Sequence, residues 1–237
     1  MMKDYQFLLF DLDDTLLDFK AAENQALPKL FAAHDFPLTP EVAHVYQEIN
    51  TGLWEALEQG TITRQKLMAT RFGKTFEYFG REANGLALDA EYRSYLAESK
   101  VFVEGAFEVI QTLAPHYELY ITSNGIAETQ SKRLQVTGLV PYFKRVFVSD
   151  ETGSQKPMKP FFDYVFERIP HFDPAKAMII GDSYRADIIG GAGAGIDTCW
   201  LNPLKKAPTT SVQPTYTIEK LPQLVEILQL ENEMIKK

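Results

Sequence analysis

The sequence predicts an α/β fold: a doubly wound parallel sheet with an α-helical bundle inserted into it. Two observations predict the sheet, namely short apolar runs that each end in polar residues, and helical stretches that separate consecutive runs. The third observation is the segment 18–100, which contains helical patterns and no convincing strand.

The apolar runs are too short and too uniform for amphipathic helices. Non-alternating runs bounded by turn residues are typical of strands that are buried on both faces of a parallel sheet. The predicted strands are Phe7–Phe10, Leu119–Thr122, Val146–Val148, Met178–Ile180 and a weaker Thr198–Leu201. The predicted helices between them cover 106–116, 128–138, 159–171 and 184–193. Such alternation implies right-handed crossovers and therefore a doubly wound sheet.

The segment 18–100 is predicted to form a separate lobe, because it places about four helices between two consecutive strands. The predicted helices cover 21–35, 40–59, 64–79 and 90–99. Thr39 followed by Pro40 predicts one helix start, and Thr63 and Asp89 are predicted caps of the last two helices. Residues 1–17 and 101–237 are then expected to form the sheet domain. The proline-rich stretch 205–214 is expected to be a surface loop.

Composition narrows the classes of partner. The formal charge is −8, so nothing indicates a surface for a nucleic-acid polymer or an anionic membrane. No apolar run approaches membrane-spanning length. Cys199 is the single cysteine, which excludes an internal disulfide, and its apolar neighbours predict a core position. We expect a soluble cytoplasmic protein, either a monomer or a weak oligomer, that acts on a small molecule.

Polar residues gather where the predicted strands end. Asp11 and Asp13 follow the first strand, Ser123 and Asn124 the second, and Asp182 the fourth, with Asp187 just beyond. Lys156 follows the third strand after a short loop. Because ligands bind at the carboxyl ends of parallel strands, we expect these side chains to form one site. Several carboxylates together suit a hard cation, above all Mg²⁺.

Other chemistries fit the sequence poorly. A calcium loop starting at Asp11 would need Gly and Glu where Leu16 and Ala22 stand. The four histidines are not next to any candidate nucleophile, which argues against a Ser/His/Asp triad. There is no GxxxxGK loop. The GGAGAG stretch at 190–195 follows a helix, so close packing of that helix on the sheet explains it better than dinucleotide binding does.

In combination and order, the motifs resemble those of the haloacid dehalogenase-like hydrolase superfamily. They are Asp-Leu-Asp-Asp-Thr-Leu from Asp11, Ser-Asn-Gly from Ser123, Lys-Pro at Lys156, and Gly-Asp-Ser from Gly181 with Asp187. This resemblance implies a Rossmann-like core with residues 18–100 as a helical cap. The stretches LLDFKAAENQAL, YQEINTGLWEALEQGTITRQKLMATRF and DTCWLNP are similar to the pyrimidine-nucleotide 5′-nucleotidase branch.

The resemblance implies a phosphatase that forms an aspartyl-phosphate, and the chemistry of each residue type agrees. Asp11 would be the covalent nucleophile and Asp13 the general acid and base. Mg²⁺ would be held by Asp11, the backbone carbonyl of Asp13 and Asp182, with Asp187 supporting it from outside the coordination sphere.

Phosphoryl binding and substrate choice complete the expected roles. Ser123, Asn124 and Lys156 would bind the phosphoryl group. The expected substrate is a nucleoside 5′-monophosphate, preferably pyrimidine, with cap residues Asn50, Trp54 and Arg71 as candidate contacts. Trp54 could instead belong to the bundle core, and Arg71 could pair with a cap acid.

Alternatives remain open at this point. A 2-haloacid dehalogenase also uses the first aspartate, but it needs no acid such as Asp13 to protonate an alkoxide. A sugar-phosphate or phosphoglycolate phosphatase, or a phosphomutase, would use the same core residues. A catalytically silent binding protein on this fold would have lost one of the carboxylates, and none is missing.

Overall fold

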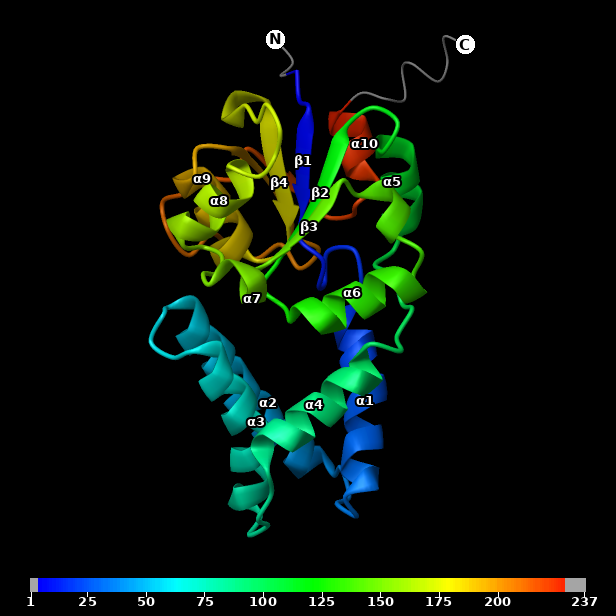
Figure 1. Ribbon diagram of the computed structural model, residues 1–237, viewed down its shortest axis with the longest axis vertical. Helices are drawn as coiled ribbons and strands as arrows, with labels where there is room; N and C mark the ends of the chain where they lie inside the picture. Colours follow the sequence, from blue (N-terminus) through cyan, green and yellow to red (C-terminus); the bar gives the residue numbers. More distant parts are fainter. Residues whose placement is uncertain (1–3, 229–237) are drawn as a thin grey trace. The chain divides into compact units, whose positions relative to one another are not determined.

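The computed structural model describes residues 4–228 and divides the chain into two compact units. Met1–Phe19 and Lys100–Lys237 form one unit, which we call the sheet unit, and Lys20–Ser99 form the other, which we call the helical unit. Figure 1 shows the strands gathered in the sheet unit, whereas the helical unit contains helices. Within residues 4–228, no helix is both long and apolar enough to cross a bilayer.

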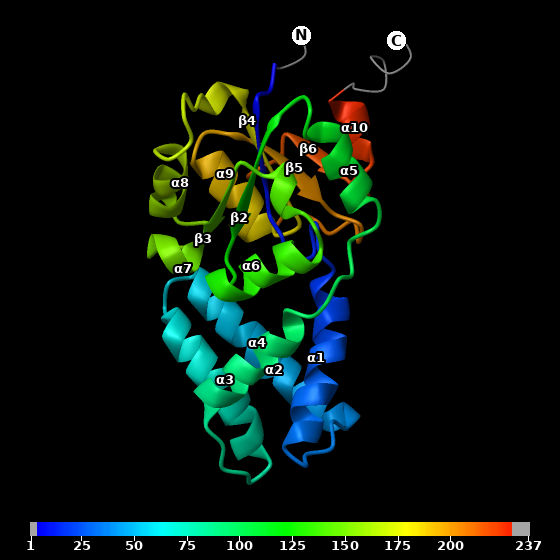
Figure 2. The ribbon, with the colours of Figure 1, turned by 45° about the vertical axis from the view of Figure 1, so that its right-hand side comes forward.

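The sheet unit contains six parallel strands in the order β3-β2-β1-β4-β5-β6. Their bounds are β1 Phe7–Phe10, β2 Glu118–Ser123, β3 Arg145–Val148, β4 Ala177–Gly181, β5 Asp197–Leu201 and β6 Tyr216–Ile218. All five predicted strands are confirmed, whereas the three-residue β6 at the sheet edge was not predicted (Figure 2). The strand order reverses between β1 and β4, which places the ligand-binding crevice of such a sheet beside the end of β1.

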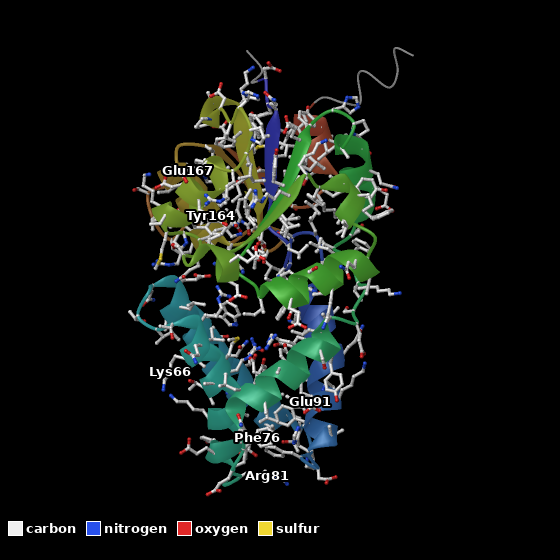
Figure 3. The ribbon with its side chains drawn as sticks, in the orientation of Figure 1. Lys66, Phe76, Arg81, Glu91, Tyr164 and Glu167 are labelled. Atoms are coloured by element: carbon white, nitrogen blue, oxygen red, sulfur yellow. The ribbon has the colours of Figure 1, made fainter. Side chains whose placement is uncertain are left out.

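Helices cover both faces of the sheet, as the predicted doubly wound fold requires. On one face, Leu8 and Phe10 of β1 belong to a core with α5 (Ala106–Leu113), α6 (Ala127–Val136) and α10 (Gln223–Ile227). On the other face, Phe7 and Leu9 pack with α8 (Lys159–Phe166). Figure 3 marks Tyr164 and Glu167 at the C-terminal end of α8, where Glu167 is exposed.

The predicted helix 184–193 is interrupted. It begins as the π-helical turn η3 (Tyr184–Ile189) and continues as α9 (Gly190–Gly193). A Cβ at Gly191 would lie closer than 3.0 Å to the methyl groups of Ile179 and Thr198. Close helix-to-sheet packing therefore accounts for Gly191, as predicted, whereas a Cβ at Gly193 would meet no atom within 4 Å. The remaining short elements are η1 (Val140–Tyr142), α7 (Ser149–Thr152) and η2 (Pro174–Lys176).

The helical unit consists of α1, whose first residue belongs to the sheet unit, and three further helices. Their bounds are α1 Phe19–Ala33, α2 Pro40–Glu58, α3 Arg64–Tyr78 and α4 Gly85–Leu96. Thr39 accepts a hydrogen bond from Val42 N at 3.3 Å and Thr63 one from Lys66 N at 3.2 Å, so both predicted caps are confirmed.

The predicted start of α4 was wrong. Asn84 caps this helix by accepting from Ala87 N at 3.2 Å, and Asp89 lies inside the helix as a buried residue. Asp89 has a cap-forming side chain, but its carboxylate is used in a tertiary ion pair with Arg71. The capping preference of the aspartate side chain was therefore outweighed by an ion pair between α3 and α4.

Candidate active site

The predicted acidic residues meet where three neighbouring strands end. Asp11 follows β1, Ser123 ends β2 and Asp182 follows β4. The pairing of β1 with β4 continues one residue beyond the strand, since Asp11 N donates to the carbonyl of Ile180 at 2.9 Å. Parallel pairing thus brings together residues 171 positions apart, 182 − 11 = 171, at the topological switch point.

Lys156 lies at the centre of this cluster. Its side chain is 1% exposed, and its Nζ donates to Asp11 Oδ1 at 2.8 Å, Asp187 Oδ1 at 2.6 Å and the carbonyl of Thr122 at 2.7 Å. These bonds use all three donors of an ammonium group. Burial by itself lowers the pKa of Lys156, but the carboxylates of Asp11 and Asp187 outweigh it and raise that pKa above its ordinary value. The ammonium therefore remains charged.

Asp187 reaches the cluster from η3. Its second oxygen, Oδ2, accepts from Ser183 N at 3.1 Å, and the Ser183 hydroxyl accepts from Ala186 N at 3.1 Å. A Cβ at Gly181 would overlap the Asp187 carboxylate, with several atoms closer than 3.0 Å. The Gly-Asp-Ser sequence thus has a structural reason, because only glycine leaves room for this buried carboxylate under the end of β4.

The carboxylates outnumber the ammonium. Burial is the main cause that raises the pKa of Asp11 to about 7; Lys156 opposes this shift, and Asp187 and Asp13 contribute to it. Burial, together with the charge of Asp11, raises the pKa of Asp182 well above its usual range. One cation therefore offsets only part of the charge of Asp11, Asp182 and Asp187.

This donor set fits a hard divalent cation. One carboxylate oxygen from each of Asp11, Asp182 and Asp187 can be chosen so that all lie within 4.8 Å of one another. Oxygen donors with excess negative charge are what Mg²⁺ requires of a protein site. Both oxygens of Asp187 already accept hydrogen bonds from Lys156 and Ser183. Asp11 and Asp182 are thus the better placed direct ligands.

Two further residues support this cluster and were not singled out from the sequence. The Thr15 hydroxyl lies 3.4 Å from both Asp11 Oδ2 and Asp182 Oδ1 and accepts from Asp182 N at 3.1 Å. The indole Nε1 of the buried Trp200, in β5, donates to the carbonyl of Asp182 at 2.9 Å. Thr15 follows Asp11 by four residues, within the first motif, which was the available signal.

Asp13 lies in the turn after β1 and is held by α6. Gln130 Nε2 donates to Asp13 Oδ2 at 2.6 Å, and Arg133 NH1 forms an ion pair with Asp13 Oδ1. Neither α6 residue was predicted. The signal that could have identified them is their spacing, because Gln130 and Arg133 lie four and one residues before the buried Leu134, on the same helix face.

The two polar residues of the second motif have different partners. Ser123 Oγ accepts from Gly125 N at 3.0 Å and from Gln130 Nε2 at 2.9 Å. Asn124 exchanges two hydrogen bonds of 2.9 Å with the backbone N–H and carbonyl of Lys156. The Asn124 side chain therefore fixes the loop that carries Lys156. Phosphoryl binding by Ser123, Asn124 and Lys156 remains a prediction.

The three substrate candidates of the helical unit differ in their surroundings. Arg71 is buried, donates to Asp89 Oδ1 through Nε at 2.7 Å and through NH2 at 2.6 Å, and lies over the Tyr92 ring. Asn50 is 6% exposed, and its Oδ1 has no hydrogen-bond partner in the part of the chain that the structure describes. Trp54, one helical turn from Asn50, is partly exposed. Arg71 is thus part of an ion pair inside the helical unit. In contrast, the side-chain oxygen of Asn50 is an acceptor that no described group uses.

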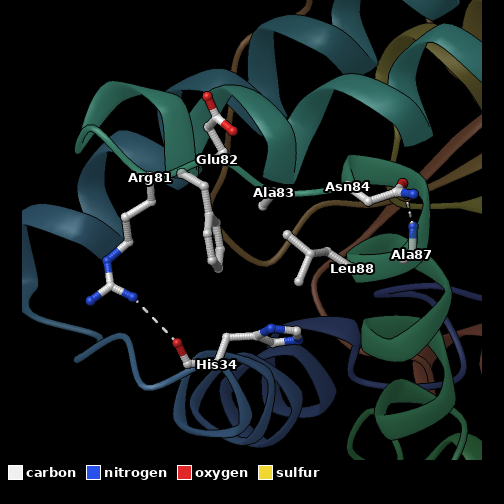
Figure 4. A pocket seen from close by; sticks show the side chains of 8 residues that line it. His34, Arg81, Glu82, Ala83, Asn84, Ala87 and Leu88 are labelled. Atoms are coloured by element: carbon white, nitrogen blue, oxygen red, sulfur yellow. Dashed lines mark hydrogen bonds between the residues drawn. The ribbon is translucent and has the colours of Figure 1, made fainter.

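A separate pocket of about 430 Å³ lies in the helical unit, between the end of α1 and the start of α4 (Figure 4). Phe76 and Leu88 form its apolar wall. Arg81 donates to the carbonyls of His34 and Asp35, His34 pairs with Glu91, and Asn84 caps α4. Its polar groups therefore serve the bundle itself, and we assign it no ligand.

Cys199 is unsuited to nucleophilic chemistry. The thiol is buried in β5, and burial raises its pKa to about 12. The thiolate is the reactive form of cysteine, so this side chain is inert at neutral pH. The predicted core position of Cys199 is confirmed.

The chain is similar to known proteins over almost its whole length. Residues 8–201 match the family model of haloacid dehalogenase-like hydrolases. The HAD-hydrolase YfnB of Bacillus subtilis is 50% identical over 98% of each chain. Its magnesium-bound crystal structure, 49% identical, covers 96% of this chain and 100% of its own, with a TM-score of 0.91.

Two further relatives have named activities. The pyrimidine 5′-nucleotidase PynA of Streptococcus pneumoniae is 41% identical over 94% of this chain and 95% of its own. The pyrimidine 5′-nucleotidase YjjG of Escherichia coli is 31% identical over 94% of this chain and 98% of its own. With the motifs assembled at the switch point of a six-stranded parallel sheet, the chain belongs to the haloacid dehalogenase-like hydrolase family.

Proposed function

We propose that this hydrolase is a Mg²⁺-dependent phosphatase of nucleoside 5′-monophosphates that prefers pyrimidine nucleotides. The observation that carries the proposal is the buried cluster of Asp11, Asp182 and Asp187 around Lys156, with Asp13 on the adjoining turn. A nucleophile, an acid/base and an excess of carboxylates at one strand edge are the groups that phosphomonoester hydrolysis needs.

In the first step, a carboxylate oxygen of Asp11 attacks phosphorus, and the bond from phosphorus to the ester oxygen breaks. Asp13 gives its proton to the departing alkoxide, so the nucleoside leaves as a neutral alcohol. Lys156 holds Asp11 Oδ1 at 2.8 Å and thereby fixes the direction of the nucleophile. The product of this step is an aspartyl-phosphate at residue 11.

In the second step, Asp13 removes a proton from a water molecule that attacks the same phosphorus. The bond between phosphorus and Asp11 breaks, inorganic phosphate leaves, and the Asp11 carboxylate is restored. Asp13 is again protonated and ready for the next substrate. The N–H groups at the ends of β1 and β2, with Ser123, are proposed to hold the phosphoryl oxygens. Lys156 would join them by exchanging its bond to the Thr122 carbonyl for one to the phosphoryl group.

Asp11, Asp182 and the backbone carbonyl of Asp13 are proposed to hold Mg²⁺, with Asp187 orienting Lys156. When bound, the ion supplies positive charge that reduces the repulsion between carboxylate and phosphate. The magnesium bound in the YfnB crystal structure, at 49% identity, supports the choice of this ion.

The nucleotide preference rests on the two pyrimidine 5′-nucleotidases among the relatives. We further propose that the helical unit is the cap that selects the leaving group. Within it, Asn50 and Trp54 are the proposed base contacts, because a free amide oxygen can accept from the N3–H of uracil or thymine and an indole can stack on the ring. The ion pair with Asp89 favours a structural role for Arg71.

The test is phosphate release measured with and without Mg²⁺ across dUMP, dTMP, AMP, glucose 6-phosphate and phosphoglycolate. We expect activity only with the metal, and the highest kcat/KM for a pyrimidine nucleotide. Asn50→Leu and Trp54→Ala should reduce the preference for pyrimidines, whereas Trp54→Phe should retain most of it. A sugar phosphate or phosphoglycolate that exceeded every nucleotide would overturn the substrate assignment and leave the phosphatase assignment intact.

A further inference from the structure

Both oxygens of Asp13 are held by one helix, α6. Gln130 donates to Oδ2 at 2.6 Å, and Arg133 forms an ion pair with Oδ1. The two α6 residues also contact each other, since Arg133 NH1 donates to Gln130 Oε1 at 3.1 Å. We call Gln130 and Arg133 the α6 clasp. It connects α6 to a residue more than 100 positions earlier in the chain.

The clasp is a built feature and not a chance contact at the surface. The side chain of Arg133 is 2% exposed, and Asp13 is the only carboxylate in residues 4–228 with which it forms an ion pair. Placing a guanidinium in such a position is costly unless it is paired. A Cβ at Gly125 would come closer than 3.0 Å to three side-chain atoms of Gln130, so the glycine of the second motif leaves the space that Gln130 occupies.

The clasp leaves Asp13 capable of proton transfer. A carboxylate has about four lone-pair sites, and the clasp occupies two of them. The Asp13 side chain is still 30% exposed, in contrast to its buried partner Arg133. Gln130 Nε2 also donates to Ser123 Oγ at 2.9 Å, so the same amide contacts the acid/base and a proposed phosphoryl-binding hydroxyl.

Without the clasp, Asp13 would be free to rotate. It belongs to a sharp turn after β1, in which Asp14 has a φ of 56° and Leu16 N and Leu17 N both donate to the carbonyl of Leu12. The backbone of this turn is fixed, but it does not select a χ angle for Asp13. A displacement of about 1 Å in a catalytic group can cost on the order of 10²-fold in rate.

We propose that Gln130 and Arg133 are positioning residues that hold the carboxylate of Asp13 in the orientation needed for proton transfer to the leaving alkoxide. The inference rests on the proposed phosphatase activity and goes beyond it, because it assigns a role in that reaction to the helix after the second motif. Arg133 fixes one oxygen, and Gln130 aligns the other with the phosphoryl site through Ser123.

The first test compares leaving groups in single-turnover phosphorylation. Gln130→Met and Arg133→Met should each slow phosphorylation by an alkyl phosphate about 10- to 100-fold. They should slow phosphorylation by 4-nitrophenyl phosphate less than about threefold, since that leaving group needs no proton. Gln135→Met and Lys132→Met, on the exposed side of the same helix, are the matched controls and should leave both rates unchanged.

The second test is a double-mutant cycle with Asp13→Asn, measured with the alkyl phosphate. If the clasp acts through Asp13, Gln130→Met and Arg133→Met should have no further effect in the Asp13→Asn background. Equal losses in both backgrounds, or equal losses on both leaving groups, would overturn the positioning role and leave the phosphatase intact. Absence of Mg²⁺-dependent activity in the wild type would instead overturn the proposed function.

Folding is controlled within the same set of variants. Arg133→Lys keeps the charge, and Gln130→Asn keeps the amide on a shorter side chain. These two variants replace the methionine variants in the rate measurements if a methionine variant has a lowered Tm. Arg133→Lys should restore part of the alkyl-phosphate rate relative to Arg133→Met. Equal alkyl-phosphate rates for these two variants at equal Tm would contradict a role through the charge of Arg133.

Discussion

The strand-end cluster and the interior of the helical unit both bury charged side chains, but their charges are balanced differently. In the helical unit, Asp89 lies between Arg71 and Arg93, with Oδ1 2.6 Å from Arg71 NH2 and Oδ2 2.7 Å from Arg93 Nε. At the strand ends, Lys156 pairs with Asp11 and Asp187, and Asp182 adds a third carboxylate within 4.8 Å of those two. The first cluster has enough cations for its acid, whereas the second has too few.

The groups that surround the buried charges of the helical unit also satisfy them. Arg71 lies over the rings of Phe72 and Tyr92, and Glu23 accepts from the hydroxyls of Tyr46 at 3.1 Å and Tyr92 at 3.0 Å. Burial raises the pKa of both tyrosines, which therefore stay protonated and serve as donors. The buried ionic groups of the helical unit find all their partners within the chain, and their role is structural. The excess negative charge of the strand-end carboxylates instead indicates a site for a cation that the chain does not supply.

Asp11→Asn should have the largest effect on activity. We expect a loss of at least about 10³-fold in kcat, because the covalent step is removed and not merely slowed. The measurement is Mg²⁺-dependent hydrolysis of a generic aryl phosphate. Asp163→Asn, at a half-exposed position of α8, makes the same chemical change and is the control. Near-wild-type turnover of Asp11→Asn would show that this carboxylate is not the nucleophile.

Asp89→Asn should have the largest effect on stability. Removing the acid leaves two arginine side chains without their shared partner, and breaking a buried pair costs about 3–5 kcal/mol. Chemical denaturation would measure this loss. Glu91→Gln removes a partly exposed acid from the same helix and should cost less than about 1 kcal/mol. Equal losses of stability in Asp89→Asn and Glu91→Gln would show that the buried ion pair of Asp89 contributes no more than the partly exposed pair of Glu91.

Mg²⁺ should stabilise the folded protein through the strand-end cluster. At a concentration of 100 times Kd, binding to the native state alone adds about 3 kcal/mol. The increase should be seen as a rise in Tm for the wild type and should be largely absent in Asp182→Asn. A Tm that responds equally to Mg²⁺ in both proteins would place the cation elsewhere.

Without added metal, Asp182→Asn should itself be more stable than the wild type, by about 1 kcal/mol. The substitution keeps the shape of the side chain and removes one of three carboxylates that repel one another within 4.8 Å. This is the smallest of the effects expected for the strand-end cluster and has the opposite sign to Asp89→Asn. A destabilised, metal-free Asp182→Asn would contradict the view that this cluster carries excess negative charge.

Much of this arrangement could be predicted from the sequence because parallel strands impose it. Once Phe7–Phe10 and Met178–Ile180 are identified as buried parallel strands, Asp11 and Asp182 are expected at the same edge of the sheet. That the two strands are direct neighbours is known only from the structure. The three-residue β6 could not be predicted in this way, since Tyr216–Ile218 is short and partly exposed at the sheet edge.

The residues that escaped prediction depend on contacts between distant parts of the chain. Arg133 and Gln130 occur in a polar helix, AETQSKRLQV, that looks solvated in isolation, and their partner lies in a turn after the first strand. Asp89 was predicted as a helix cap because its side chain favours that position, and its ion pair with Arg71 was not visible locally. Local pattern locates the elements, whereas buried polar pairs depend on the assembled fold.

The covalent role of Asp11 can be tested most directly by quenching a single turnover of dUMP in acid and locating the phosphoryl group by mass spectrometry. We expect a peptide containing residue 11 that is heavier by one phosphoryl group, formed only with Mg²⁺ and absent in Asp11→Asn. In Asp13→Asn, the modified peptide from an activated aryl phosphate should persist, because the water that hydrolyses it is no longer deprotonated. A phosphoryl group on any other residue, or none during full turnover, would contradict the mechanism.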